Sequence, residues 1–263
     1  MHVIAVSNRK GGTGKTTVSV NLAAELAASG RRTLLIDLDS QGHCGLALGL
    51  RPHTGQPNVH QLFTNPEARL TTAIQPTPFA NLWLVPADPL FDHGQSGQDD
   101  YRLKNALVAE SLAERFDLVL IDTPPSLDRL LINGLLAANR VLVPYIPHYI
   151  SVESMRQLVR LLFRIMTRQN RELKILGFVP TLSAEHIRQH RTVNAQVGGE
   201  FGAARILPGI RNDIRLAESF AAGKPVRLYA PKSRSAQDFA RLGQAVILHL
   251  ELPVPPASSA IAP

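Results

Sequence analysis

The stretch "NRKGGTGKTT", residues 8–17, combines residue types that bind phosphate groups. Glycines let the backbone approach an anion closely, and successive N–H groups ahead of a helix attract negative charge. Lys15 would reach the β- and γ-phosphates of a nucleotide, and the Thr16 hydroxyl would bind Mg²⁺. We therefore expect a nucleotide site made of Lys10, Gly11, Gly12, Thr13, Gly14, Lys15, Thr16 and Thr17.

This loop departs from the usual pattern at its start. The common phosphate-binding loop is a glycine, four residues, and then Gly-Lys-Ser/Thr. Here Arg9 stands where the first glycine belongs, and Lys10 supplies a second lysine. A solvated loop lysine is the plain interpretation of Lys10, so a functional one needs a further argument.

Acidic residues follow two apolar runs. Asp37 and Asp39 close "RTLLIDLD", and Asp122 follows four apolar residues in "LVLIDTPPS". Carboxylates at such positions order Mg²⁺ and its waters or orient an attacking water, although Asp39 or the next serine would also cap a helix. The expected metal residues are Thr16, Asp37 and Asp122, and the expected catalytic residues are Lys10, Lys15 and Asp39.

The elements that must position these residues are read from hydrophobic patterns. Strands are expected at 2–7, 32–39, 116–126, 140–146 and 173–180, and helices at 16–29, 104–115 and 152–171. The strands are near-continuous apolar runs, which is typical of a parallel sheet covered on both faces. The alternation predicts an α/β fold, a single doubly wound and mostly parallel sheet, with the motifs at the carboxyl ends of its strands.

Composition limits the domain organisation and the compartment. We expect one domain over 1–250, with an irregular excursion at 51–100, and a disordered Pro/Ala/Ser-rich tail at 251–263. One cysteine excludes an internal disulfide and favours a reducing compartment. Because no leader and no membrane-length apolar run is found, we expect a cytoplasmic protein.

Charge is divided unevenly along the chain. Residues 1–130 hold 11 basic and 13 acidic residues, whereas residues 131–263 hold 17 and 8. A net charge of −2 is therefore followed by one of +9. A basic half indicates a polyanionic partner, although a solvated basic surface would give the same balance.

Taken in order, "KGGTGKTT", "LLIDLDSQG" and "LVLIDTPPS" resemble the ParA/MinD group of deviant-Walker ATPases. The resemblance covers about 1–250, and the segment 206–243 is similar to the small ParA type, although Ser40 replaces the usual proline. It implies a P-loop NTPase fold, ATP and Mg²⁺ as cofactors, a homodimer in the ATP state, and a weak, partner-stimulated ATPase. In this family the extra lysine, here Lys10, reaches the phosphates of the other subunit, and Asp39 would orient the attacking water.

The small ParA type also implies partners and a cargo. It binds duplex DNA non-specifically, associates with the nucleoid, and positions or segregates a plasmid or chromosome locus, or a protein organelle such as a carboxysome. A ParB-like or McdB-like partner stimulates hydrolysis. The positions that resemble its DNA-contacting region are Arg211, Arg215, Lys224, Arg227, Lys232 and Arg234.

Two alternatives remain open at this stage. A MinD-like regulator would bind a membrane, but the chain has no basic residue after Arg241, so we expect no membrane partner. An ATP-dependent ligase of the dethiobiotin synthetase kind is the other alternative. A small-molecule ligase needs neither the second lysine nor the basic half.

Two further features have plainer interpretations. Arg156, Arg160, Arg164 and Arg168 lie at four-residue spacing on one face of the expected helix 152–171. We interpret this stripe as a solvated face, with DNA or an acidic partner as the alternative. His43 and Cys44 are too few for a metal site and are interpreted as loop packing.

Overall fold

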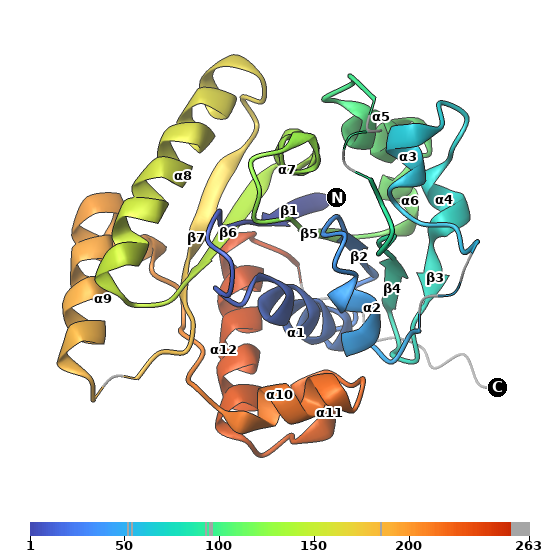
Figure 1. Ribbon diagram of the computed structural model, residues 1–263. Helices are drawn as coiled ribbons and strands as arrows, with labels where there is room; N and C mark the ends of the chain where they lie inside the picture. The colour runs from blue at the N-terminus through green and yellow to red at the C-terminus, as the bar shows by residue number, and fades with distance from the viewer. Residues whose placement is uncertain (52, 54, 93, 95–96, 185, 254–263) are drawn as a thin grey trace.

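A seven-stranded sheet forms the centre of the computed structural model, which describes residues 1–51, 53, 55–92, 94, 97–184 and 186–253 (Figure 1). The strand order is β3-β4-β2-β5-β1-β6-β7, and every neighbouring pair is parallel except β3 with β4. The strands are β1 His2–Val6, β2 Thr33–Asp37, β3 Gln75–Pro76, β4 Leu82–Val85, β5 Leu118–Asp122, β6 Arg140–Tyr145 and β7 Lys174–Pro180. The expected mostly parallel sheet is confirmed.

Helices cover both faces of this sheet (Figure 1). Those before residue 140 are α1 Lys15–Ala28, α2 His43–Ala47, α3 Gln61–Thr64, α4 Leu70–Ala73, α5 Arg102–Ala109, α6 Leu112–Arg115 and α7 Arg129–Ala137. Those after it are α8 Tyr149–Arg168, α9 Arg188–Phe201, α10 Ile214–Ala221, α11 Val226–Tyr229 and α12 Arg234–His249, with a 3₁₀ turn at Ala203–Arg205.

Alternate residues of β1 belong to two different hydrophobic cores. Val3 and Ala5 pack in the core that α7 and α8 complete, whereas Ile4 and Val6 pack in the core completed by α1 and α12. Since side chains alternate across a strand, this division places one helical layer on each face. The near-continuous apolar runs in the sequence follow from this double burial.

The structure differs from the sequence-based expectation in two places. The helix expected at 104–115 is two helices, α5 and α6, because Ser111 takes a left-handed conformation with φ of 51°. The segment 51–100, expected to be irregular, contributes β4, which extends the sheet beside β2. Four residues between proline-rich turns give too short a pattern to identify a strand. Of the expected tail, residues 254–263 lie outside the described residues.

Two backbones meet directly where the end of α2 approaches the turn between α10 and α11. A Cβ added at Gly223 would lie 2.7 Å from Gly49 Cα, and Gly223 has φ of +62°. Only a residue without a side chain fits both the conformation and the distance.

Among the described residues, no helix has the length and hydropathy needed to cross a bilayer.

We predict that Gly223→Ala lowers the free energy of unfolding by roughly 1–3 kcal/mol, because it adds left-handed strain and a steric clash. Gly199→Ala is the matched control, since a Cβ there meets nothing within 4 Å on helix α9. The control should be neutral or more stable by about 0.5–1 kcal/mol. Urea denaturation followed by circular dichroism measures both, and equal stabilities would contradict the close approach.

Candidate functional site

The loop 8–14 joins β1 to α1, and the side chains of Asn8 and Thr181 hold it in place. Asn8 donates a hydrogen bond from Nδ2 to the Pro144 carbonyl at 2.7 Å, and its Oδ1 accepts one from Lys10 N at 3.0 Å. Thr181 donates from its hydroxyl to the Thr13 carbonyl at 2.9 Å. The ends of β6 and β7 thus fix the loop, so its backbone N–H groups are arranged before any ligand arrives.

Lys15 begins α1 at the mouth of this loop. Its side chain is buried, and among the described residues it has no hydrogen-bond or ion-pair partner. Burial lowers the pKa of this ammonium, and the carboxylates of Asp122 and Asp39 oppose that shift. A desolvated cation that makes no hydrogen bond or ion pair of its own is a strong site for an anion such as phosphate.

The two strand-ending acids lie side by side because of the sheet register. β2 and β5 are parallel neighbours, and Asp37 is the register partner of Asp122. Asp122 accepts hydrogen bonds from the Thr16 hydroxyl at 2.7 Å and the Ser19 hydroxyl at 2.8 Å. The three residues expected to handle the metal, Thr16, Asp37 and Asp122, are therefore brought to one edge of the sheet.

Both acids are fully buried, and both have a raised carboxyl pKa. For Asp37 the pKa is raised well above normal by desolvation and then by the neighbouring Asp122 carboxylate. Desolvation also raises the pKa of Asp122, while the hydroxyl bonds from Thr16 and Ser19 and the Lys15 charge lower it. A divalent cation would relieve the repulsion and desolvation together. Cation binding should weaken in mild acid, because carboxyl groups with a raised pKa take up protons at pH values where an ordinary carboxylate stays ionised.

Cys44 belongs to this cluster rather than to loop packing alone. Its Sγ lies 3.5 Å from Asp122 Oδ2, and its backbone N donates to Asp37 Oδ2 at 3.0 Å. The ligand atoms of Asp37, Cys44 and Asp122 all lie within 4.8 Å of one another. Burial between the two carboxylates raises the pKa of the thiol well above normal, so it stays protonated and donates toward Asp122. His43 does pack, with its ring edge-on to Phe220 at 5.9 Å.

The other two expected catalytic residues, Asp39 and Lys10, are only half-buried. Asp39 is half-buried, and its Oδ1 accepts from Gln41 N at 3.1 Å. Lys10 is also half-buried, and within the described part of the chain its ammonium has no ion pair. Both groups can therefore meet a ligand or a second molecule.

A pocket of about 470 Å³ opens beside the loop. One wall is the start of α1 with Thr17 and Val18, and the other is formed by α10 with Leu216 and Phe220. The pocket is lined by both apolar and polar residues, which suits a flat aromatic group joined to phosphates in the loop. Sequence patterns did not reveal this pocket, because its walls are far apart in the chain.

Several contributing residues were missed from sequence. Asn8, Ser19 and Thr181 carry no motif of their own, and their roles depend on contacts across the fold. Asn8 and Ser19 flank the loop, so their polar character next to apolar neighbours was a usable signal. Thr181 follows the fourth apolar run and resembles any strand end.

The six basic residues expected to contact DNA fall into two groups. Arg211 forms a two-pronged ion pair with buried Asp238, whose carboxylate also accepts from Arg241. Arg227 pairs with Glu25 at 3.5 Å, and Arg215 with Glu218 at 2.5 Å. These interactions give the three arginines structural partners.

The other three residues, Lys224, Lys232 and Arg234, are exposed, and no ion pair holds them within the described residues. They lie around α11 and at the start of α12. These three side chains are the ones free to meet phosphates.

Comparison with known proteins agrees with this geometry. The family described as "AAA domain" matches residues 1–175. The chromosome partitioning protein ParA of Myxococcus xanthus is 34% identical over 247 residues, which cover 92% of this chain and 86% of that protein.

Solved structures give two further likenesses. Cobyrinic acid a,c-diamide synthase from Mycobacterium smegmatis with bound ADP and magnesium is 30% identical, with 96% of both chains covered and a TM-score of 0.75. Apo McdA from Cyanothece has a TM-score of 0.83 over 95% of this chain and 99% of that one, and at 22% identity it shows a shared fold. From its motifs, fold and relatives, this chain belongs to the ParA/MinD family of deviant-Walker ATPases and is of the small ParA type.

Proposed function

We propose that this protein is an ATP-dependent dimerising switch that binds duplex DNA non-specifically and positions or segregates a cargo. The cargo is a plasmid or chromosome locus, or a protein organelle such as a carboxysome. A cargo-bound partner of the ParB or McdB kind stimulates hydrolysis and so releases the dimer from the nucleoid.

One observation carries the nucleotide part of this proposal. The buried Lys15 ammonium forms no ion pair with a described residue, and it lies at the mouth of a preformed loop beside the Thr16 hydroxyl and two buried carboxylates. This combination supports ATP with Mg²⁺: Thr16, Asp37 and Asp122 would hold the metal, and the loop would hold the phosphates. The metal would neutralise phosphate charge, and Asp39 would orient the attacking water.

The position of Lys10 supports dimerisation through the nucleotide. Its side chain is half-buried, and its ammonium forms no ion pair with a described residue of its own subunit. Two ATP-bound subunits that meet face to face would bring their phosphates together, and each Lys10 would offset the charge of the other subunit's nucleotide. Dimerisation would then depend directly on whether the γ-phosphate is present.

The DNA-binding part is supported by charge without sequence-reading chemistry. Lys224, Lys232 and Arg234 are exposed cations, and dimer symmetry would double them. Tyr229 is the only aromatic residue of 221–238. Contacts to phosphates alone give binding that ignores sequence and falls steeply with salt.

An ATP-dependent ligase is the second candidate, favoured by the 30% identity to cobyrinic acid a,c-diamide synthase. A ligase would release phosphate when given a carboxylic acid and an amine donor. The proposed switch would instead respond to DNA and a protein partner. A phosphate-release assay with each addition in turn separates the two functions.

We predict that Lys10→Ala keeps ATP binding but raises the dissociation constant of the ATP dimer about tenfold or more, since each nucleotide loses the cation of the opposite subunit. Analytical ultracentrifugation with a non-hydrolysable ATP analogue measures this. Lys174→Ala, an exposed lysine that begins β7 at the opposite edge of the sheet, is the control. Normal dimerisation of Lys10→Ala would refute the bridging role.

Asp39→Ala should lower kcat for ATP hydrolysis by roughly 10²–10⁴, because a positioned carboxylate that assists proton transfer contributes about that much. ATP binding and ATP-dependent DNA binding should persist, since Asp39 does not hold the loop. Single-turnover hydrolysis and filter binding measure the two properties. Loss of both together would mean that Asp39 is structural.

Replacing Lys224, Lys232 and Arg234 together by alanine should weaken ATP-dependent binding to random-sequence duplex DNA. The salt dependence should also become shallower, by up to about 0.9 in log–log slope for each DNA phosphate that the protein no longer neutralises. Fluorescence anisotropy at several salt concentrations measures both effects.

A matched triple variant, Arg51→Ala with Arg171→Ala and Lys174→Ala, removes the same charge from other exposed positions. It should change DNA affinity little. Arg211→Ala should instead reduce stability, because it removes a partner of buried Asp238. Equal loss of DNA binding in both triple variants would leave only a general charge effect and refute the assigned surface.

A further inference from the structure

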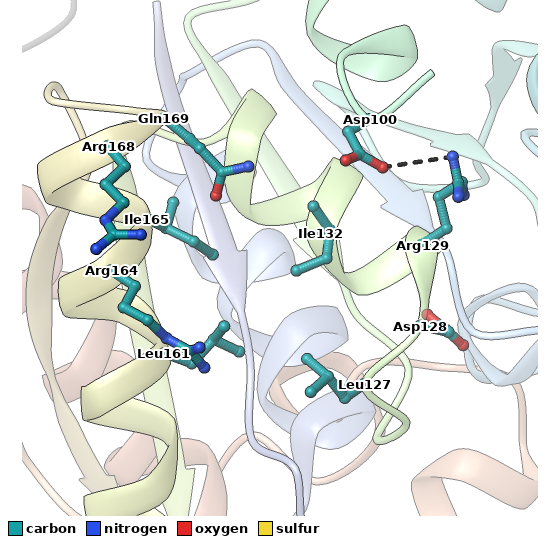
Figure 2. Close-up of a pocket in the computed structure, with 10 residues that line it drawn as sticks. All are labelled: Asp100, Leu127, Asp128, Arg129, Ile132, Leu161, Arg164, Ile165, Arg168 and Gln169. Carbon is teal, nitrogen blue, oxygen red and sulfur yellow. Dashed lines mark ion pairs between the residues drawn. The ribbon is translucent and has the colours of Figure 1, made fainter. Parts of the chain in front are cut away.

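A groove that the nucleotide site does not use lies between α7 and the second half of α8 (Figure 2). Its volume is about 620 Å³, which is within the range of binding clefts. Its apolar floor consists of half-buried Ile132 of α7 and of Leu127, whose side chain is 49% exposed. Leu161 and Ile165 of α8 also line the groove but are only 7% and 1% exposed.

The two walls of the groove differ in charge. On the α7 wall, Asp100 and Arg129 form an ion pair at 3.6 Å, drawn as the dashed line in Figure 2. On the α8 wall, Arg164 and Arg168 are exposed, and neither has an ion pair with a described residue. Their four-residue spacing keeps both guanidinium groups on the same side of the helix. The groove therefore has one wall with two carboxylates, Asp100 and Asp128, and one arginine, and one wall that carries only positive charge.

The arginine stripe seen in the sequence is divided by the fold. Arg156, its first member, is held by Glu200 of α9 at 2.5 Å and by Glu153 at 3.3 Å. Arg164 and Arg168 have no comparable acid on a neighbouring element of the described chain. The stripe is therefore ion-paired at its first member, whereas Arg164 and Arg168 have no ion pair with a described residue.

We propose that this groove binds an acidic, amphipathic segment of a partner protein. Apolar side chains of the segment would cover the floor, and its carboxylates would pair with Arg164 and Arg168. Arginine forms two-pronged bonds to carboxylates and is common where protein segments dock. Charge complementarity and the apolar floor together select this occupant.

Duplex DNA fits the groove less well. It offers phosphates to the arginines but no apolar side chains to cover Leu127 and Ile132.

An occupied groove would touch the nucleotide site indirectly. Leu127 and Asp128 belong to the loop between Asp122 and α7, and Asp128 caps α7 by accepting from Leu131 N at 3.0 Å. A bound segment would therefore contact the loop that follows the Asp122 carboxylate. This placement does not depend on DNA binding, so the inference stands separately from the proposed function.

A display selection of random short peptides against the full chain tests the proposal. The enriched peptides should combine Asp or Glu with Leu, Ile or Phe. Their affinities, measured by fluorescence anisotropy, should fall about tenfold or more in the double variant Arg164→Glu, Arg168→Glu, because two carboxylate pairs become repulsive. The same binding should weaken with added salt.

Arg171→Glu with Lys174→Glu is the matched control, since both residues are exposed, follow α8 directly and do not line the groove. It should bind the selected peptides like the unmodified protein. Absence of enrichment, enrichment of basic peptides, or equal peptide affinity in the two double variants would overturn the proposal. Loss of DNA binding in the groove variant alone would assign the surface to nucleic acid and also overturn it.

Discussion

Two buried carboxylates, Asp37 and Asp122, lie side by side at the ends of adjacent parallel strands. The register that pairs Asp37 with Asp122 is fixed by the sheet, so neither acid can move away from the other without disrupting β2 or β5. Around them the fold gathers two hydroxyls, a thiol and the Lys15 ammonium. Ionising both acids in this buried position is costly, and a bound cation would offset that cost.

Cations elsewhere in the molecule are divided by the same principle. Where an arginine approaches a buried or half-buried acid, as Arg211 approaches Asp238, it ties helices together. Where no acid of the described chain pairs with the cation, as at Lys232 or Arg164, the charge is exposed to solvent. Net charge alone could not separate these groups, because both contribute equally to the basic second half.

The sequence was sufficient for the parts of the site that lie within one strand–loop–helix segment. Lys15, Thr16 and the acids at strand ends carry local patterns, and the parallel sheet explains why they converge. The sequence was insufficient where a role depends on contacts between residues that are far apart in the same chain. Thr181 supports the loop from 168 residues away, and Cys44 takes on chemical character only through its distance from Asp122. Likewise β4 is too short to be recognised without its partner β2.

The packing of α2 against α10 has a mechanical consequence. The His43 ring sits edge-on against Phe220, and further along the two glycine backbones of Gly49 and Gly223 touch without any side chain between them. Because no side chain separates the two glycine backbones, this contact has little room to compress, and a shift of one segment displaces the other. α2 follows directly from the loop that carries Asp39, and Phe220 lines the pocket beside the phosphate loop. Movement of either helix therefore displaces the other, which couples the shape of the pocket beside the loop 8–14 to the position of Asp39.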